Sequence, residues 1–480
     1  MKKIFFAIML LVGAVSVLDA KVELPPVFAD NMVLQQQTQA AVWGKAKPNA
    51  KVRITTTWSK DKTEVTADEN GKWFARIKTP QAGGPYEITF NDGEKVTLKN
   101  VLIGEVWICS GQSNMEMPMK GFYGQPVKGA HDLIFGAKSS TPIRSCNVAR
   151  KIALEPQETC DATWYEHTPK GVANASATAY FFAKKLYEVL GIPVGIINVS
   201  WGGTPIRSWM SPELLKKEFA SEVSLKHFET GVLPDEYQSH CAGVLYNGML
   251  RSVVPFTAKG FLWYQGCTDR NKPELYKRLQ PAFAQMLRQE WDSETIMPFY
   301  FVQIAPYEYD GQDNRQAGFM MWAQAQTLAD IPFSGMAATH DAGERACIHP
   351  ANKKVVGDRL AYLALENDYC VGGFDSRTPI PSKFEFKDGE ALVSFACCAL
   401  GLSPINMDIE GFELAGEDQV FYPAKARIIG GECKQIKVYQ CPQVPKPVAV
   451  RYGMRNWSEA TLFNNFGIPV TPFRSDDWNN

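Results

Sequence analysis

The 480-residue chain lacks the sequence features of several large functional classes. Its 50 Lys and Arg residues are balanced by 51 Asp and Glu residues, so the net charge of −1 shows no basic surplus of the kind that nucleic-acid-binding proteins carry. It has no Cys-x-x-Cys pair and no Cys/His cluster with zinc-like spacing, so no metal is expected. It also has no Gly-x-Gly-x-x-Gly fingerprint, internal repeat or low-complexity segment, and no cofactor is expected.

Long apolar runs are equally scarce, and only residues 4–17 form one. This run follows Lys2 and Lys3 and precedes Ala20, which is the order of regions in a secretory signal peptide. A membrane anchor is the alternative, but the run is shorter than the roughly 20 residues that span a bilayer. We therefore expect residues 1–20 to be a signal peptide and the mature protein to be periplasmic or secreted.

Export permits disulfides, but the 11 Cys residues are an odd number, so at least one is unpaired. Several lie in apolar, strand-like runs, such as Cys109 in VWICS and the adjacent pair Cys397 and Cys398. Buried free thiols are therefore as compatible with the sequence as bridges are.

Three regions follow the leader. Residues 21–103 show short β-rich runs between turn signals, which predicts a small β-sandwich. Residues 104–370 alternate strand and helix patterns, which predicts a three-layer α/β domain with a parallel sheet. Residues 371–480 return to a β pattern and are expected to pack on the other two regions. The clearest α/β elements are strands at 104–110, 194–200, 257–266, 298–306 and 334–341 and helices at 175–190, 273–291 and 350–366.

Polar residues follow four of the predicted α/β strands. Ser113 stands on a Gly-led turn, where its Oγ is exposed and the next helix offers N–H groups to an oxyanion. A Gly-Gly loop at 202–203, an amide at Gln265 and one of only six His residues, His349, follow other strands. Taken singly, each segment also suits an ordinary turn or cap, so the case rests on their combination at one sheet edge.

Together these segments resemble the sialate O-acetylesterase family of the SGNH-hydrolase superfamily. The resemblance is carried by GEVWICSGQSNMEMPM, NVSWGGTPIRSWMSP, YNGML with GFLWYQG, and IHPANKKVVGDRLA, in the family's order and spacing. VFADNMVLQQ near the start and NWSEATLFNNFGIPVTPFRSDDW at the end extend it over essentially the whole chain after residue 20.

The resemblance implies hydrolysis of acyl esters, with acetyl as the expected group and O-acetylated sialic acid as its expected carrier. Ser113 matches the family's nucleophile and His349 its histidine. The backbone N–H of Ser113, the N–H of a glycine and the amide of Gln265 would form the oxyanion hole. We favour Gly203 over Gly202 for the glycine.

The sequence departs from the family pattern at the acid of the triad. The third motif usually reads WYQGESN, and Cys267 stands at its acidic position. Ala346 and Cys347 stand where related enzymes carry an Asp before the His. Asp269 is our predicted replacement as a catalytic residue. The alternatives are Glu344, Asp341, or a Ser–His dyad in which a backbone carbonyl holds the imidazole.

Three further residues are predicted to bind substrate: Arg207, Thr204 and Asn114. Arg207 suits a sialic acid carboxylate, although a structural or solvated role is the alternative. Two other functions stay open, an acetylesterase acting on xylan or another glycan, and a glycan-binding pseudo-enzyme that has lost its acid. No membrane span beyond the leader, no nucleic-acid partner and no particular oligomeric state is predicted.

Overall fold

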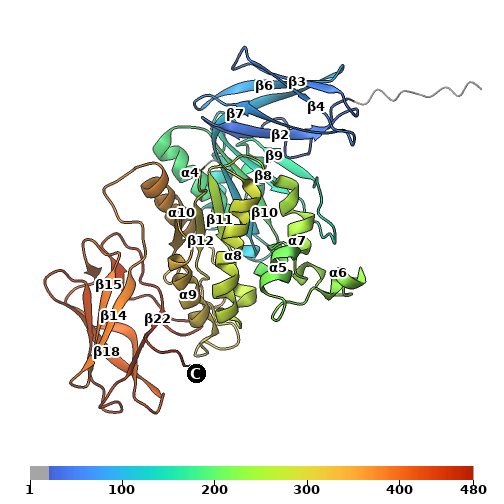
Figure 1. Cartoon of the computed structure of the whole chain (residues 1–480). Helices are drawn as coiled ribbons and strands as arrows, with labels where there is room; N and C mark the ends of the chain where they lie inside the picture. The colour runs from blue at the N-terminus through green and yellow to red at the C-terminus, as the bar shows by residue number, and fades with distance from the viewer. Residues whose placement is uncertain (1–20, 294, 479–480) are drawn as a thin grey trace, which may run out of the picture.

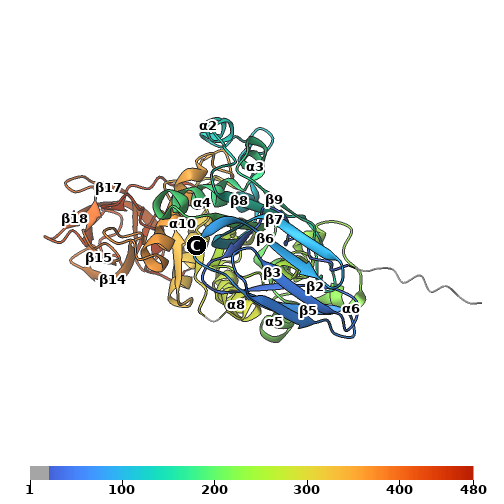
Figure 2. The same cartoon turned by 90° about the horizontal axis from the view of Figure 1, so that it is seen from above.

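The structure, a computed structural model, describes residues 21–293 and 295–478, so the predicted signal peptide lies outside the described residues. Three regions follow one another through the molecule (Figure 1). The N-terminal and C-terminal β regions lie at opposite ends of a central α/β domain, as the view from above also shows (Figure 2).

The central sheet is mixed rather than wholly parallel. Its strand order is β13 (Ser334–Ala337), β12 (Phe299–Val302), β11 (Gly260–Tyr264), β7 (Lys95–Gly111), β10 (Val194–Ser200), β8 (Ile143–Val148) and β9 (Ala162–Tyr165). The first six are parallel, and β9 pairs antiparallel with β8 at the edge. The chain adds β8 and β10 on one side of β7 and then β11 to β13 on the other. The carboxyl end of β7 is thus a topological switch point, where ligands of such sheets bind.

Two helical layers cover this sheet because its strands are apolar on both faces. In β7, Val106 and Ile108 belong to one core cluster, and Trp107 and Cys109 to another. Helices α8 (Pro273–Trp291) and α9 (Gln316–Gln326) pack on the first face, and α4 (Ala177–Leu190) and α10 (Lys353–Asp368) on the second. Smaller helices are α2 (Ala130–Phe135), α3 (Pro169–Asn174), α5 (Pro212–Glu218), α6 (Lys226–Thr230) and α7 (Val244–Gly248).

The N-terminal region is all β, as predicted. A ribbon of β2 (Gln39–Lys45) and β5 (Lys72–Lys78) accompanies a sheet of β1 (Val33–Gln35), β3 (Lys51–Thr56), β4 (Lys62–Thr66), β6 (Gly83–Asn91) and the first half of β7. The 17-residue β7 continues from this sheet into the central one. The predicted boundary at 103/104 therefore falls inside one strand, which fixes the first region to the second.

The C-terminal region is an antiparallel sheet. Its order is β14 (Ile380–Lys387), β15 (Glu390–Ala396), β19 (Gln435–Val438), β18 (Phe421–Ile429), β17 (Ile409–Ala415), β20 (Ala449–Tyr452) and β22 (Phe473–Arg474), beside a small pair β16 (Leu402–Ser403) and β21 (Phe463–Asn464). The sheet curls until its edges almost meet, since the rings of Phe384 and Phe473 lie 5.9 Å apart. It packs on the α/β domain, where Arg315 pairs with Glu413 at 2.8 Å.

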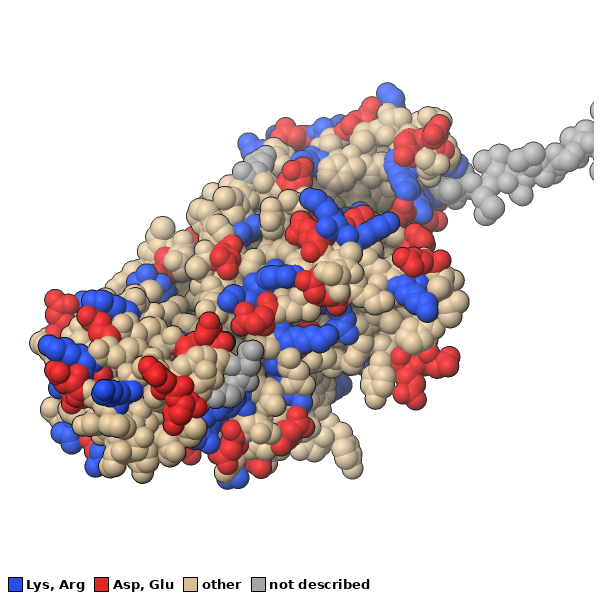
Figure 3. All heavy atoms as spheres, turned by 60° about the horizontal axis from the view of Figure 1, so that its bottom comes forward, with Lys and Arg blue, Asp and Glu red and all other residues tan. Residues whose placement is uncertain are grey.

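All 11 cysteines are free, and six of the 11 are buried. Acidic and basic side chains are intermixed over the face that Figure 3 presents. Within residues 21–293 and 295–478, no helix has the length and apolar character needed to cross a membrane.

Candidate active site

Ser113 lies where β7 ends at the switch point. Gly111 has φ 140°, and a Cβ on it would lie 2.2 Å from the carbonyl oxygen of Tyr264 on β11. Glycine is therefore needed for the chain to turn sharply while touching the neighbouring strand. Helix α1 (Ser113–Glu116) begins at Ser113, so the N–H of Ser113 is in a first turn and has no acceptor within the helix.

His349 reaches Ser113 from the loop between β13 and α10. Its Nε2 lies 2.7 Å from Ser113 Oγ, hydrogen-bond distance for a general base and its nucleophile. Burial, and then the positive charge of Lys353, lowers the pKa of His349 to about 4. The imidazole is consequently neutral near pH 7 and able to accept the hydroxyl proton.

Gln125 takes the position of the third triad member. Its Oε1 lies 2.5 Å from His349 Nδ1. Gln125 and Phe122 exchange backbone hydrogen bonds of 3.0 Å across a tight turn, and the ring of Phe122 packs edge-on against the imidazole at 5.4 Å. The sequence analysis missed Gln125, because nothing in the segment around it marks an amide that folds back onto a histidine more than 200 residues away.

None of the predicted acids contacts His349. Asp269 instead accepts hydrogen bonds from Ile206 N at 2.9 Å and from Gln265 Nε2 at 2.7 Å. The two alternatives are occupied elsewhere: Glu344 accepts from the N–H of residue 351, and Asp341 forms a bidentate pair with Arg359. The prediction of Asp269 as the catalytic acid is therefore wrong in this structure, because its carboxylate organises the loops after β10 and β11.

Gln265 is also not free to act as predicted. Its amide nitrogen donates to Asp269 and to the carbonyl oxygen of Thr204 at 3.1 Å. Both N–H groups are used, and the side chain is fully buried. An amide with no remaining N–H cannot stabilise an oxyanion, so Gln265 ties two strand-end loops together.

The Gly-Gly loop lies directly against the nucleophile. A Cβ on Gly202 would lie 3.2 Å from Ser113 Cβ, so only glycine fits there without a shift. The Gly202 N–H donates to Glu116 Oε2 at 2.8 Å, and Glu116 also binds Arg150. The N–H of Gly203 donates to no other described residue, and its φ is 76°. Glu116 lies one helical turn after Ser113, a spacing that the sequence analysis did not use.

Asn114 and Thr204 are structural rather than open to substrate. Asn114 is 1% exposed, donates to Ile348 O at 3.0 Å and accepts from Lys353 Nζ, so it joins the segment after the nucleophile to the segment before the histidine. Thr204 is fully buried and bonded to Trp201 and Trp209. Both predictions of substrate contact are corrected by this burial.

Arg207 remains accessible beside the site. Its side chain is 34% exposed and lies 3.8 Å from Asp269 Oδ1. His240 also faces this side, because its Nε2 is 3.9 Å from where a Cβ of Gly203 would stand. Burial, and then the charge of Arg207, lowers the pKa of His240. Nothing in the sequence around His240 marks it for a role at this site.

Comparison with known proteins relates the chain to carbohydrate esterases. A profile of carbohydrate esterases described as sialic acid-specific acetylesterase matches residues 103–366. The chain belongs to this family. Human sialate O-acetylesterase is 28% identical over 485 residues, which is 92% of this chain and 90% of the human protein. A carbohydrate acetylesterase from Xanthomonas citri has a solved structure with TM-score 0.85 and 31% identity, covering 95% of this chain and all of that one.

As a member of this carbohydrate esterase family, the chain is an esterase. Its unusual Cys267 does not stand where a partner of His349 would. Cys267 is buried beside Tyr309, Arg270 and Lys353. A carboxylate at this position would lie near the cations Arg270 and Lys353, and no contact between Cys267 and His349 is found among the described residues, so the expectation that Cys267 marks the missing triad acid is not supported.

Proposed function

We propose that the chain removes O-acetyl groups from a glycan through an acyl-enzyme on Ser113. The observation that carries this proposal is the continuous hydrogen-bonded line from Gln125 through His349 to Ser113. Ser113 Oγ attacks the acetyl carbonyl carbon while His349 Nε2 takes the hydroxyl proton. The imidazolium then gives this proton to the departing sugar oxygen. Water, activated by the same nitrogen, releases acetate and restores Ser113.

Gln125 supplies orientation without charge. An amide oxygen at Nδ1 keeps the proton on that nitrogen, so Nε2 stays free to accept from Ser113. A carboxylate would also stabilise the imidazolium that forms in each transition state, which a neutral amide does only weakly. We therefore propose a Ser–His–Gln triad that is slower than one with an acid.

Two backbone N–H groups are best placed to stabilise the oxyanion. The N–H of Ser113 at the start of α1 and the N–H of Gly203 are both without partners in the described chain. Glu116 holds the adjacent Gly202 in place, so the loop is preorganised before substrate arrives. Removal of one such donor typically lowers kcat by about 10²–10³.

For the acetyl carrier we propose O-acetylated sialic acid. Arg207 is the cation that a sialic acid carboxylate would meet, and its own contact with Asp269 is long enough to leave donors available. The second candidate is a neutral glycan such as acetylated xylan, which is favoured by the similarity to a bacterial enzyme described only as a carbohydrate acetylesterase. We further propose that the protein acts in the periplasm or outside the cell, on the evidence of residues 1–20.

The test uses purified wild type, Ser113→Ala and His349→Ala with p-nitrophenyl acetate, O-acetylated sialic acid and acetylated xylan. Each variant should lose at least about 10³ in kcat, and the double variant should be little worse, because members of one catalytic unit are non-additive. Ser110→Ala is the matched control, since Ser110 donates to Val199 O inside the sheet. Near wild-type turnover by Ser113→Ala would exclude the acyl-enzyme.

The choice of carrier is tested with Arg207→Met. This change should raise KM for O-acetylated sialic acid about tenfold or more and leave p-nitrophenyl acetate unaffected, because only the former has a carboxylate. An unchanged KM for O-acetylated sialic acid would point to acetylated xylan or another neutral glycan.

A further inference from the structure

A pocket of about 530 Å³ opens between the N-terminal β region and the segment that leads into β11. Its residues Val254 and Pro255 precede the amino end of β11, whereas Ser113 lies at the carboxyl end of β7. Strand β11 alone has five residues, which at about 3.3 Å each separates the two places by about 17 Å. Gln125, His349 and Ser113 are not among the residues that line it.

One wall of the pocket is aromatic. Trp43 on β2 and Phe74 on β5 are direct partners in the antiparallel ribbon, so their side chains emerge on the same face. Phe74 is 45% exposed, which is high for an aromatic side chain, and Trp43 is held edge-on by Phe28 at 4.6 Å. The ribbon thus presents two adjacent rings, one of them fixed, to the cavity.

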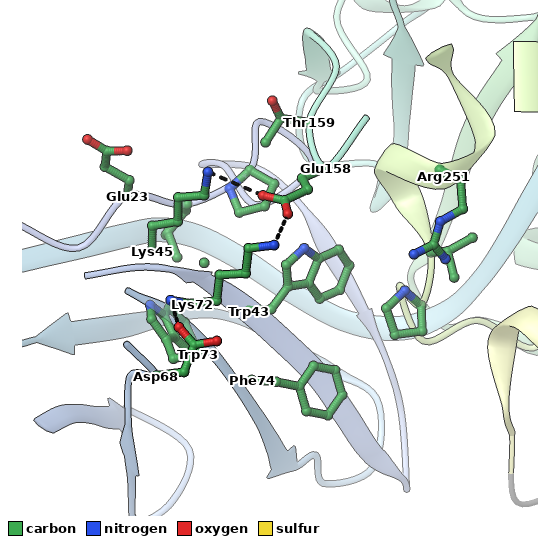
Figure 4. A pocket seen from close by; sticks show the side chains of 15 residues that line it. Glu23, Trp43, Lys45, Asp68, Lys72, Trp73, Phe74, Glu158, Thr159 and Arg251 are labelled. Carbon is green, nitrogen blue, oxygen red and sulfur yellow. Dashed lines mark hydrogen bonds and ion pairs between the residues drawn. The ribbon is translucent and has the colours of Figure 1, made fainter. Parts of the chain in front are cut away.

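The rim of the pocket is charged. Lys45 and Lys72, which flank the aromatic pair along the ribbon, both bind the carboxylate of Glu158 from the α/β domain, the first at 3.2 Å. Arg251 faces these groups from the other side of the cavity (Figure 4), anchored by Glu290 at 2.9 Å. Donors and acceptors therefore surround the rings and come from two regions that β7 holds rigidly together.

We propose that this pocket is a second carbohydrate-binding site, which holds an unacetylated sugar ring of a glycan chain. A pyranose has an apolar C–H face and an equatorial rim of hydroxyls, and the pocket offers an aromatic wall for the first and charged hydrogen-bonding groups for the second. Clefts between rigid units, with apolar walls and a few placed polar groups, are the usual form of small-ligand sites. The site goes beyond the proposed ester hydrolysis, because it contains no nucleophile or base aligned for chemistry.

Such a site would tether a polymeric substrate. A glycan held at one end of the molecule keeps its other segments near the active site, which raises their effective concentration without changing the chemical step. Small esters, which cannot span about 17 Å, would gain nothing.

The experiment is affinity electrophoresis of the full chain in gels that contain a de-O-acetylated sialoglycoprotein, deacetylated xylan or deacetylated glucomannan, which lack the scissile acetyl group. The wild type should be retarded by at least one polymer, and Phe74→Ala should weaken that retardation about tenfold. Phe333→Ala, an exposed phenylalanine remote from the pocket, is the matched control and should migrate as the wild type does. All three proteins should hydrolyse p-nitrophenyl acetate equally, which shows that they are folded.

Absence of retardation in all three polymers would overturn the proposal, and so would equal retardation of Phe74→Ala and the wild type. Lys72→Met gives an independent arm, because it removes a rim group without touching the aromatic wall, and it should also weaken retardation. If the wild type did not hydrolyse p-nitrophenyl acetate, the proposed function would be refuted. The binding test could still be interpreted, because it does not depend on hydrolysis.

Discussion

Replacement of Gln125 by Glu is the most direct test of how this site works without an acid. The change keeps the shape of the side chain and puts a carboxylate oxygen where Oε1 now lies 2.5 Å from His349 Nδ1. It converts the neutral triad into an acidic one at a single position. Gln125→Ala is the matched variant, because it removes the hydrogen bond without adding charge.

The magnitude follows from the surroundings of the imidazole. Burial and Lys353 now lower the pKa of His349 to about 4. An opposite charge within hydrogen-bond distance raises a basic group's pKa by about 1–3, so the pKa of His349 in Gln125→Glu should lie at roughly 5–7. The imidazolium formed in the transition state gains the same interaction, and kcat/KM at pH 8 should rise about tenfold or more. In Gln125→Ala the productive tautomer is no longer held, and kcat/KM should fall about tenfold to 10²-fold.

The assay is kcat/KM for p-nitrophenyl acetate from pH 3.5 to 9, since its acidic limb reports the base of the free enzyme. The wild-type limb should lie near pH 4, and that of Gln125→Glu should be shifted upward. If both limbs coincide and the plateau is unchanged, Gln125 does not hold the imidazole and the triad assignment fails. A fall in activity in Gln125→Glu with a shifted limb would show instead that greater basicity is offset by lost geometry.

Three further changes test neighbouring parts of the argument. Lys353→Met removes a cation that lowers the pKa of His349, so the acidic limb of the kcat/KM profile should move to higher pH. The shift should be smaller than in Gln125→Glu, because burial is the larger cause of the lowered pKa. An unmoved limb would contradict this. Cys267→Glu should leave kcat/KM within about threefold of the wild type, because Cys267 has no contact with His349 among the described residues and a new carboxylate there would lie near Arg270 and Lys353. Burial lowers the pKa of His340 to about 4, so the unfolded chain binds a proton that the folded chain does not; from pH 6.5 to pH 4 the free energy of unfolding should fall by about 3 kcal/mol more in the wild type than in His340→Asn. Urea titrations of the wild type and His340→Asn at both pH values check this, and parallel losses in the two proteins would assign the effect to other groups.

The sequence was sufficient for the elements with strong local signals. Helix α8 was predicted at 273–291 and begins and ends at those residues, because Pro273 suits a first turn and the apolar period is long. The hairpin of β14 and β15 turns at Asp388-Gly389, a residue pair typical of tight hairpin turns, and both residues have positive φ. The antiparallel edge strand β9 was not predicted, because direction is set by tertiary pairing rather than by composition.

The proposed nucleophile and base could be predicted because each is marked within its own short segment. Ser113 and His349 both follow strands, and the structure brings them to 2.7 Å. Gln125 could not be predicted in the same way, since its role comes from a turn that folds over the imidazole from a distant part of the chain. Asp269 and Gln265 were misassigned for the opposite reason: both are close to the site in sequence, but they satisfy each other.

The buried lysine explains why an amide serves at this site. Lys353 is 1% exposed and binds Asn114, and the nearby groups that favour its charge are Cys267, Cys347 and Glu344. Burial lowers the pKa of Lys353 to about 7, so near neutral pH its charge is only partly present. The positive charge of Lys353 disfavours the imidazolium form of His349. Because the partner of Nδ1 is an amide and not a carboxylate, no described negative charge at Nδ1 offsets this effect. The base is thereby kept deprotonated down to acidic pH, at the expense of transition-state stabilisation. We therefore expect the site to stay competent over a wide pH range rather than to reach the highest rate, and restoring a carboxylate at residue 125 should raise the rate and narrow that range together.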